Sequence, residues 1–161
     1  MPGGNVLAVL PQDLYAPIVD NKGRERVQHV EYVVTDVRGE KVYITADGLT
    51  YSEDSLEAKE QNYLIEKLSR LSDILAHPDI VIWDPAEAPG DTLIYYKRLY
   101  IAVLRRHKLV AAIVKVRRGI KFFYNLHVQE SGKVKGLTIV PPMEIRVWYI
   151  APQVRRRQVG L

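Results

Sequence analysis

The chain has 161 residues, 47% of them hydrophobic and 26% charged, and no cysteine, which together exclude a disordered chain, disulfides, thiolate metal sites and a cysteine nucleophile. The formal net charge of +4 conceals an uneven distribution: residues 92–161 hold 15 of the 23 Lys/Arg and 2 of the 19 Asp/Glu, a charge of +13, and residues 1–91 carry −9. Aromatic residues lie among the basic ones in residues 92–161, a combination that is typical of proteins that bind nucleic acids.

The acidic part of the chain begins with residues 1–28, whose prolines and glycines show no helical or strand period. We predict an N-terminal arm packed on the domain. The apolar run at residues 6–10 is too short for a signal peptide or a membrane span. We therefore expect a cytoplasmic protein, or one associated with a virion, with no membrane partner.

Residues 29–45 predict a β-hairpin, because two segments rich in β-branched and aromatic residues flank a turn that ends at Gly39. Residues 50–77 predict one long helix that carries a single apolar stripe and is ended by Pro78. The leucines of this stripe are Leu64, Leu68, Leu71 and Leu75.

From residue 79 onward the periodicity is that of strands. The predicted strands are residues 80–83, 92–99, 109–117, 120–128 and 143–150. A basic C-terminal tail, residues 151–161, follows them. We therefore predict a single α+β domain, residues 29–150, in which one long helix packs against a twisted antiparallel β-sheet that includes the N-terminal hairpin.

Residues 109–128 predict a hairpin whose register depends on the length of its loop. A three-residue loop, residues 117–119 with Gly119 left-handed, places Lys115 opposite Lys121 and gathers the apolar residues on one core face. The other face then carries Lys115, Lys121, Phe123, Asn125 and His127. A two-residue loop is the alternative, and it moves Lys115 and Arg117 to the side of Phe122 and Leu126.

The predicted outward face of this hairpin is a candidate site. Two lysines at opposite strand positions repel each other, so the pair Lys115 and Lys121 favours an anion between them. Lysines that splay into solvent are the alternative. The cationic form of His127 is disfavoured beside lysines, so a neutral His127 can act as a general base. An exposed histidine without a role is the other interpretation.

A second cluster, residues 95–98 (YYKR), lies on the strand predicted at 92–99. The sequence does not decide which side of the sheet Lys97 faces: it points either to the core or to the opposite side. A tyrosine here can stack on a base, although core packing is the commoner fate. The basic runs at residues 105–108 and 155–157 suit either non-specific nucleic-acid affinity or a solvated surface. The sequence contains no phosphate-binding glycine loop and no ligand cluster of metal type, so we expect no metal and no cofactor.

Residues 75–85 (LAHPDIVIWDP), 92–97 (TLIYYK) and 108–115 (KLVAAIVK) together resemble the phage-type branch of the barnase–EndoU–colicin–RelE-like (BECR) ribonuclease superfamily. Domains of this branch have a helix that ends in a Pro-Asp segment, a Tyr-Tyr-Lys-like strand, and a hydrophobic strand that ends in Lys before a final strand. The resemblance covers roughly residues 50–128. It implies a helix packed on an antiparallel sheet, with a metal-independent ribonuclease site on the open face.

At the matching positions the resemblance implies that Lys97 and Lys115 contact phosphate or transfer protons. It also implies a polar residue on the final strand, near Asn125 or His127. One departure concerns the helix, where members of this branch often carry an Arg-His pair. This chain has no histidine in residues 30–76.

Lys59 or His127 would then substitute for the missing helix histidine, or the domain is catalytically inactive. The expected function is RNA binding with metal-independent endoribonuclease activity, toxin-like and phage-related, that leaves a 2′,3′-cyclic phosphate. The expected catalytic residues are His127, Lys115, Lys97 and Lys121. The expected substrate-binding residues are Asn125, Phe123, Tyr96, Arg98 and Arg117.

The main alternative is a catalytically inactive nucleic-acid-binding or phage structural protein of the same fold. A third interpretation is a toxin-like protein whose basic surface is covered by an acidic protein inhibitor. The opposite charges of residues 1–91 and 92–161 also allow head-to-tail association into a homo-oligomer.

Overall fold

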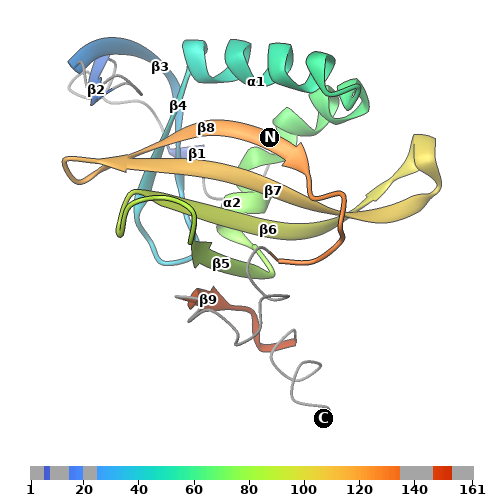
Figure 1. The fold of residues 1–161 in the computed structure, drawn as a ribbon. Helices are drawn as coiled ribbons and strands as arrows, with labels where there is room; N and C mark the ends of the chain where they lie inside the picture. The colour runs from blue at the N-terminus through green and yellow to red at the C-terminus, as the bar shows by residue number, and fades with distance from the viewer. Residues whose placement is uncertain (1–5, 8–14, 20–24, 135–146, 154–161) are drawn as a thin grey trace.

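The computed structural model describes residues 6–7, 15–19, 25–134 and 147–153 (Figure 1). Within them the strands form a mixed sheet in the order β1-β3-β4-β8-β7-β6-β5-β9, with β2 paired to β3. The strands are β1 (Val6–Leu7), β2 (Tyr15–Val19), β3 (Glu25–Thr35), β4 (Lys41–Thr45), β5 (Ile80–Trp83), β6 (Thr92–Ile101), β7 (Arg106–Arg117), β8 (Ile120–Val128) and β9 (Val147–Ile150). The predicted α+β class is correct, and so is the N-terminal hairpin, which is β3–β4.

Two details of the predicted sheet need correction. Strands β4 and β8 pair in parallel, so the sheet is mixed rather than antiparallel throughout. Part of the predicted arm, residues 1–28, is also strand, because β2 pairs with the first residues of β3. Of the predicted last strand, residues 147–150 form β9 on the edge of β5. Residues 143–146 and most of the predicted tail lie outside the described residues.

The single long helix predicted over residues 50–77 is wrong. The structure has α1 (Ala46–Ala58), a 3₁₀ stretch η1 (Asn62–Arg70) and α2 (Leu71–Ala76). Helix α1 ends because Glu60 takes a left-handed conformation with φ 57°. The amide of Glu60 then donates to the Glu57 carbonyl at 3.1 Å, and the Gln61 amide donates to the Leu56 carbonyl at 2.8 Å. This is a Schellman helix end, in which a glycine usually occupies the position of Glu60.

Glycine at position 60 is therefore expected to raise the free energy of unfolding by about 0.5–1 kcal/mol, because it removes the steric penalty of a side chain at positive φ. Urea unfolding measures the effect. Glu57→Gly is the matched control, since residue 57 lies in the last turn of α1, and it should lower stability by about 1 kcal/mol. Equal losses in both variants would contradict the helix end described above.

Helix α1 lies along the edge of β8, where β4 no longer pairs with it (Figure 1). Side chains take the place of the absent strand partner: the Leu126 amide donates to Ser52 Oγ at 3.1 Å, and the Val128 amide donates to Gln61 Oε1 at 3.0 Å. Contact is close, since a Cβ on Gly48 would lie 2.8 Å from the Phe123 carbonyl oxygen. The edge of β8 is thereby satisfied and protected by α1.

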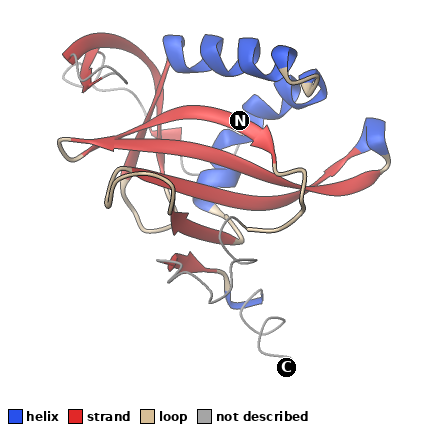
Figure 2. Ribbon diagram, in the orientation of Figure 1, coloured by secondary structure: helices blue, strands red, loops and turns tan. Residues whose placement is uncertain are grey.

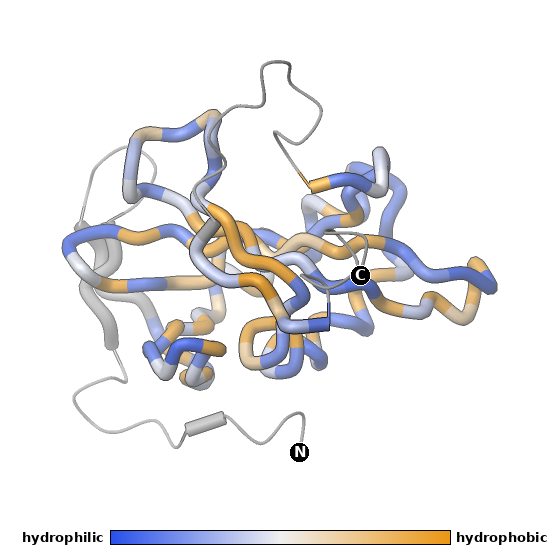
Figure 3. The backbone as a smooth tube through the Cα atoms, turned by 90° about the horizontal axis from the view of Figure 1, so that it is seen from below, coloured by the Kyte–Doolittle hydropathy of each residue, from blue (hydrophilic) through white to orange (hydrophobic). Residues whose placement is uncertain are grey.

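The sheet buries apolar residues on both faces. Figure 2 shows the helices (blue) beside the strands of the sheet (red), and Figure 3 shows the hydropathy of the residues along the backbone. The face against α2 and η1 holds the main core, which includes all four leucines of the predicted stripe. From the central strands β6, β7 and β8 this core takes Leu93, Tyr95, Leu99, Ile101, Val110, Ala112, Val114, Phe123, Leu126 and Val128. Alternate residues point to the other face, called here the far face, where a second cluster consists of Ile80, Ile82, Ile94, Tyr96, Leu109, Ala111 and Val134.

The register of the β7–β8 hairpin differs from the prediction. Arg117 pairs with Ile120, so the loop has two residues, Arg118 and Gly119, with φ of 51° and 78°. Two consecutive positive φ angles are the mark of a type I′ turn, and this turn suits the twist of a hairpin. Val116, not Lys115, therefore lies opposite Lys121. The three-residue loop is wrong because Arg118 adopts a left-handed conformation that its residue type does not indicate.

A β-bulge then shifts the register of β8 once more. Val114 pairs with Phe123 and Ile113 pairs with Asn125, so Tyr124 is the extra residue. Before the bulge, Lys121 and Phe123 belong to the face of the main core. Beyond it, Asn125 and His127 pair with residues of the far face.

Candidate functional site

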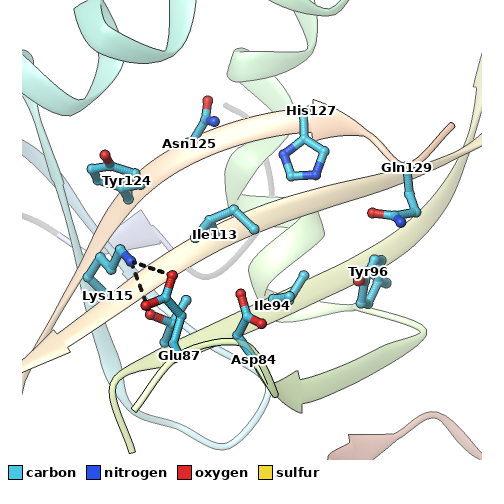
Figure 4. Close-up of a pocket in the computed structure, with 11 residues that line it drawn as sticks. Asp84, Glu87, Ile94, Tyr96, Ile113, Lys115, Tyr124, Asn125, His127 and Gln129 are labelled. Carbon is cyan, nitrogen blue, oxygen red and sulfur yellow. Dashed lines mark hydrogen bonds and ion pairs between the residues drawn. The ribbon is translucent and has the colours of Figure 1, made fainter. Parts of the chain in front are cut away.

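A pocket of about 300 Å³ opens on the far face of the sheet (Figure 4). It is lined by Asp84, Glu87, Thr92, Ile94, Tyr96, Ile113, Lys115, Tyr124, Asn125, His127 and Gln129. Strands β6, β7 and β8 form its floor, and the loop between β5 and β6 forms one wall. Apolar floor residues with a few polar and charged groups around them are usual in binding pockets.

Lys115 is the cation of this pocket. The residue is only 8% exposed, and its Nζ atom lies 3.2 Å from Thr92 Oγ1. Two carboxylates are near, with Glu87 Oε1 and Asp91 Oδ2 each 3.9 Å from Nζ. Strand pairing explains the arrangement, because Lys115 lies directly opposite Thr92, the first residue of β6. The loop that precedes β6 is thereby brought to the ammonium group, and its carboxylates compensate the buried charge.

The acidic wall of the pocket was not predicted, because Asp84 and Glu87 belong to the acidic part of the chain, residues 1–91. Asp84 shapes this loop: its Oδ1 accepts from the Ala86 amide at 2.9 Å and its carbonyl accepts from the Glu87 amide at 3.2 Å. The Glu87 side chain is 45% exposed at the mouth of the pocket. The breakers Pro85 to Gly90 indicate a loop here, but only the β6–β7 register places that loop beside Lys115.

His127 lies across the pocket from the acidic loop, on β8 opposite Ala111 (Figure 4). Its ring points into the pocket and its Nδ1 atom is buried. A histidine, a carboxylate and an ammonium group around one cavity are the types of side chain that general acid–base catalysis uses. Asn125 also belongs to the lining, yet its side chain turns toward α1, where Oδ1 accepts from Ser52 Oγ at 3.5 Å.

Tyr124 lines the pocket and contacts a second tyrosine, Tyr51, which is not among the lining residues. The bulged residue Tyr124 contacts Tyr51 of α1, with ring centroids 5.0 Å apart and hydroxyl oxygens 3.4 Å apart. The hydrogen bond with Tyr124, and secondarily partial burial, raise the pKa of Tyr51 above its ordinary value. Lys115 Nζ lies 5.1 Å from the centroid of the Tyr124 ring. Neither tyrosine was predicted as a site residue; for Tyr124 the reason is that a bulge leaves no periodic signal.

The structure brings together four of the nine predicted site residues: Lys115, His127, Asn125 and Tyr96 all line the pocket. Arg117 does not line the pocket but binds the loop that forms its wall. Its Nη1 atom lies 2.6 Å from Asp91 Oδ1 and also donates to the Asp91 carbonyl. Arg98 is exposed on β6, and its amide donates to Asp79 Oδ2 at 2.8 Å.

Lys97, Lys121 and Phe123 lie on the other face of the sheet, contrary to the expectation of one shared site. The Lys97 ammonium group donates to the His77 carbonyl at the end of α2. Phe123 is fully buried in the main core. For Lys121 and Phe123 the correction follows from the two-residue turn, because a one-residue slip moves a side chain to the opposite face. Lys97 alternates with Tyr95 and Leu99 of the main core along β6, so it shares their face.

Lys121 belongs to a separate polar cluster. Its ammonium group pairs with Glu40 and lies 3.6 Å from Asp36 Oδ2 and 4.2 Å from the Trp148 ring centroid. The Tyr95 hydroxyl donates to Asp36 Oδ2 at 2.7 Å. Burial, more than the nearby carboxylate, raises the pKa of Tyr95 far above its ordinary value. This cluster joins the β3–β4 turn to β6, β8 and β9, and its position marks it as part of the scaffold.

The described residues contain no group of three or more His, Asp or Glu side chains that could hold a metal ion. None of the helices in the described ranges is long and apolar enough to cross a membrane. Comparisons of the chain with models of protein families, with curated proteins and with solved structures found no match.

Proposed function

We propose that the protein is a metal-independent endoribonuclease whose site is the far-face pocket, and that it cleaves RNA to a 2′,3′-cyclic phosphate and a 5′-hydroxyl. The observation that carries the proposal is the meeting of Lys115, Glu87 and His127 around one cavity. The resemblance to the BECR superfamily supports it further, since that family implies a site on the face of the sheet away from the helix. The basic character of residues 92–161 favours a polyanionic substrate.

The pocket residues divide the reaction between them. The Glu87 carboxylate accepts the proton of the ribose 2′-hydroxyl, and the 2′-oxygen attacks phosphorus. The Lys115 ammonium group attracts the non-bridging phosphate oxygens as negative charge grows on them. Glu87 thereby takes the role of base that was expected of His127, and His127 donates a proton to the 5′-oxygen as the bond from phosphorus to that oxygen breaks. Lys97 and Lys121 take no part, because the sheet separates them from the pocket.

The alternative is a nucleic-acid-binding protein without activity, and one observation favours it. The β6–β7 hairpin ends in exposed Arg105, Arg106 and His107, and Figure 1 shows this end projecting from the body of the sheet. Phosphate contacts at such a projection give affinity without any contribution from the pocket.

An RNA cleavage assay in EDTA separates the two proposals. The wild-type protein is compared with Lys115→Ala/His127→Ala and with the matched control Lys67→Ala/His77→Ala, which removes the same residue types outside the pocket. Cleavage by the wild type and the control, but not by the pocket variant, is the expected result. Intact RNA with salt-sensitive gel retardation would instead support the binding protein. Absence of retardation at low salt would contradict both and favour a protein partner, such as an acidic inhibitor.

A further inference from the structure

A continuous aromatic surface leads from the pocket to solvent. Tyr124 forms part of the pocket wall, and Tyr51 contacts it from α1 with a ring-centroid distance of 5.0 Å. Tyr51 is 46% exposed, and the other large hydrophobic side chains with comparable exposure in the described ranges, Tyr100 and Val103, lie at the end of the β6–β7 hairpin. A partly exposed ring that rests on a second ring is a ready surface for stacking.

The cation of the pocket adjoins this aromatic surface. Lys115 Nζ lies 5.1 Å from the Tyr124 ring centroid, so the order outward from the pocket is ammonium group, Tyr124 and then Tyr51. A nucleotide presents the same two features side by side, a phosphate anion and a planar base. The bulge in β8 is what turns Tyr124 to this position, and bulges often redirect side chains beside active sites.

We propose that Tyr51 and Tyr124 form a base-stacking subsite through which the pocket selects single-stranded RNA. The inference rests on the proposed ribonuclease function and adds the class of substrate to it. A base within a duplex has both faces covered by its neighbours, so its stacking on a tyrosine requires unpaired RNA. Stacking on an aromatic side chain tolerates any base, so the subsite confers a preference for single strands rather than for a sequence.

The test measures binding rather than cleavage. Fluorescence anisotropy in EDTA follows a labelled eight-nucleotide oligoadenylate, and an abasic oligomer with the same backbone, on His127→Gln protein. In this background Tyr51→Leu is expected to weaken binding of the oligoadenylate tenfold or more and to leave binding of the abasic oligomer unchanged. Tyr51→Phe keeps the ring and should bind as the parent does.

Two results would overturn the subsite. Equal affinity of the parent and Tyr51→Leu for the oligoadenylate, while the wild-type protein cleaves RNA, would remove the subsite and leave the proposed function intact. An equal loss for the base-bearing and the abasic oligomer would show that Tyr51 acts through the structure of the protein instead of by stacking. If the wild type failed to cleave RNA and neither oligomer bound, the result would contradict both the proposed subsite and the proposed function.

Discussion

Replacing Glu87 by glutamine is expected to slow RNA cleavage about 10²–10⁴-fold, because the amide cannot accept the proton of the 2′-hydroxyl. The same substitution should remove the acid limb of the pH profile of kcat/KM, which rises with pH as the general base loses its proton. His127→Gln should slow cleavage by a similar factor and remove the alkaline limb, which falls as the general acid loses its proton. Steady-state rates from pH 4 to 9 measure both effects.

Glu66→Gln is the control for this prediction, since Glu66 is exposed on η1, away from the pocket lining. It should leave the rate and both limbs of the profile unchanged. If His127→Gln removed the acid limb and Glu87→Gln the alkaline limb, the two roles would be exchanged. Wild-type rates in both pocket variants would show that cleavage takes place elsewhere on the molecule.

The second large effect concerns stability and the carboxylate of Asp36, whose side chain is fully buried. Its Oδ1 accepts from the amides of Arg38 at 2.9 Å and Glu40 at 3.0 Å, and its Oδ2 accepts from the Tyr95 hydroxyl. Asp36→Ala removes the acceptor of these three donors and one of the carboxylates beside the Lys121 ammonium group. We expect it to lower the free energy of unfolding by about 3–5 kcal/mol.

Urea unfolding measures this loss as a lower midpoint with an unchanged m-value. Asp36→Asn should lose less, because its amide oxygen can still accept from the two backbone amides. Asp54→Ala removes an exposed carboxylate of α1 and should stay within about 0.5 kcal/mol of the wild type. A loss below 1 kcal/mol in Asp36→Ala would contradict the structural role of this cluster.

Much of the fold follows from local pattern. The leucine stripe, the β3–β4 hairpin and the apolar strands 80–83, 92–99 and 109–117 were predicted, and the structure has them buried or paired accordingly. The reason is that alternation and 3.6-residue periodicity report directly which side chains must leave water. Periodicity therefore predicts which face of each segment is buried, but it does not predict how the strands align with one another.

Two of the errors, the unbroken helix and the three-residue loop, share a cause. Glu60 ends α1 and Arg118 closes the β7–β8 turn, both with positive φ, and neither residue type signals a left-handed conformation. A glycine at position 60 would have indicated the break in the helix. An asparagine at position 118 would have indicated the two-residue turn. Because these signals are absent, the sequence predicted one unbroken helix and a longer hairpin loop.

The candidate site shows the same division. Lys115 and His127 were expected to share a face, and they do. That agreement needed two shifts that were not predicted. The short turn moved Lys121 and Phe123 to the face of the main core, and the bulge at Tyr124 returned Asn125 and His127 to the far face. The acidic wall, with Asp84 and Glu87, came to the pocket through the pairing of Thr92 with Lys115.

The sequence by itself determined the α+β class, the uneven charge and which segments are buried, because these depend on residue type and on spacing along the chain. The tertiary structure alone decided which charged groups meet. Strand register and a single bulge set the face of every residue beyond them, and both depend on backbone conformation and on pairing with segments distant in the chain.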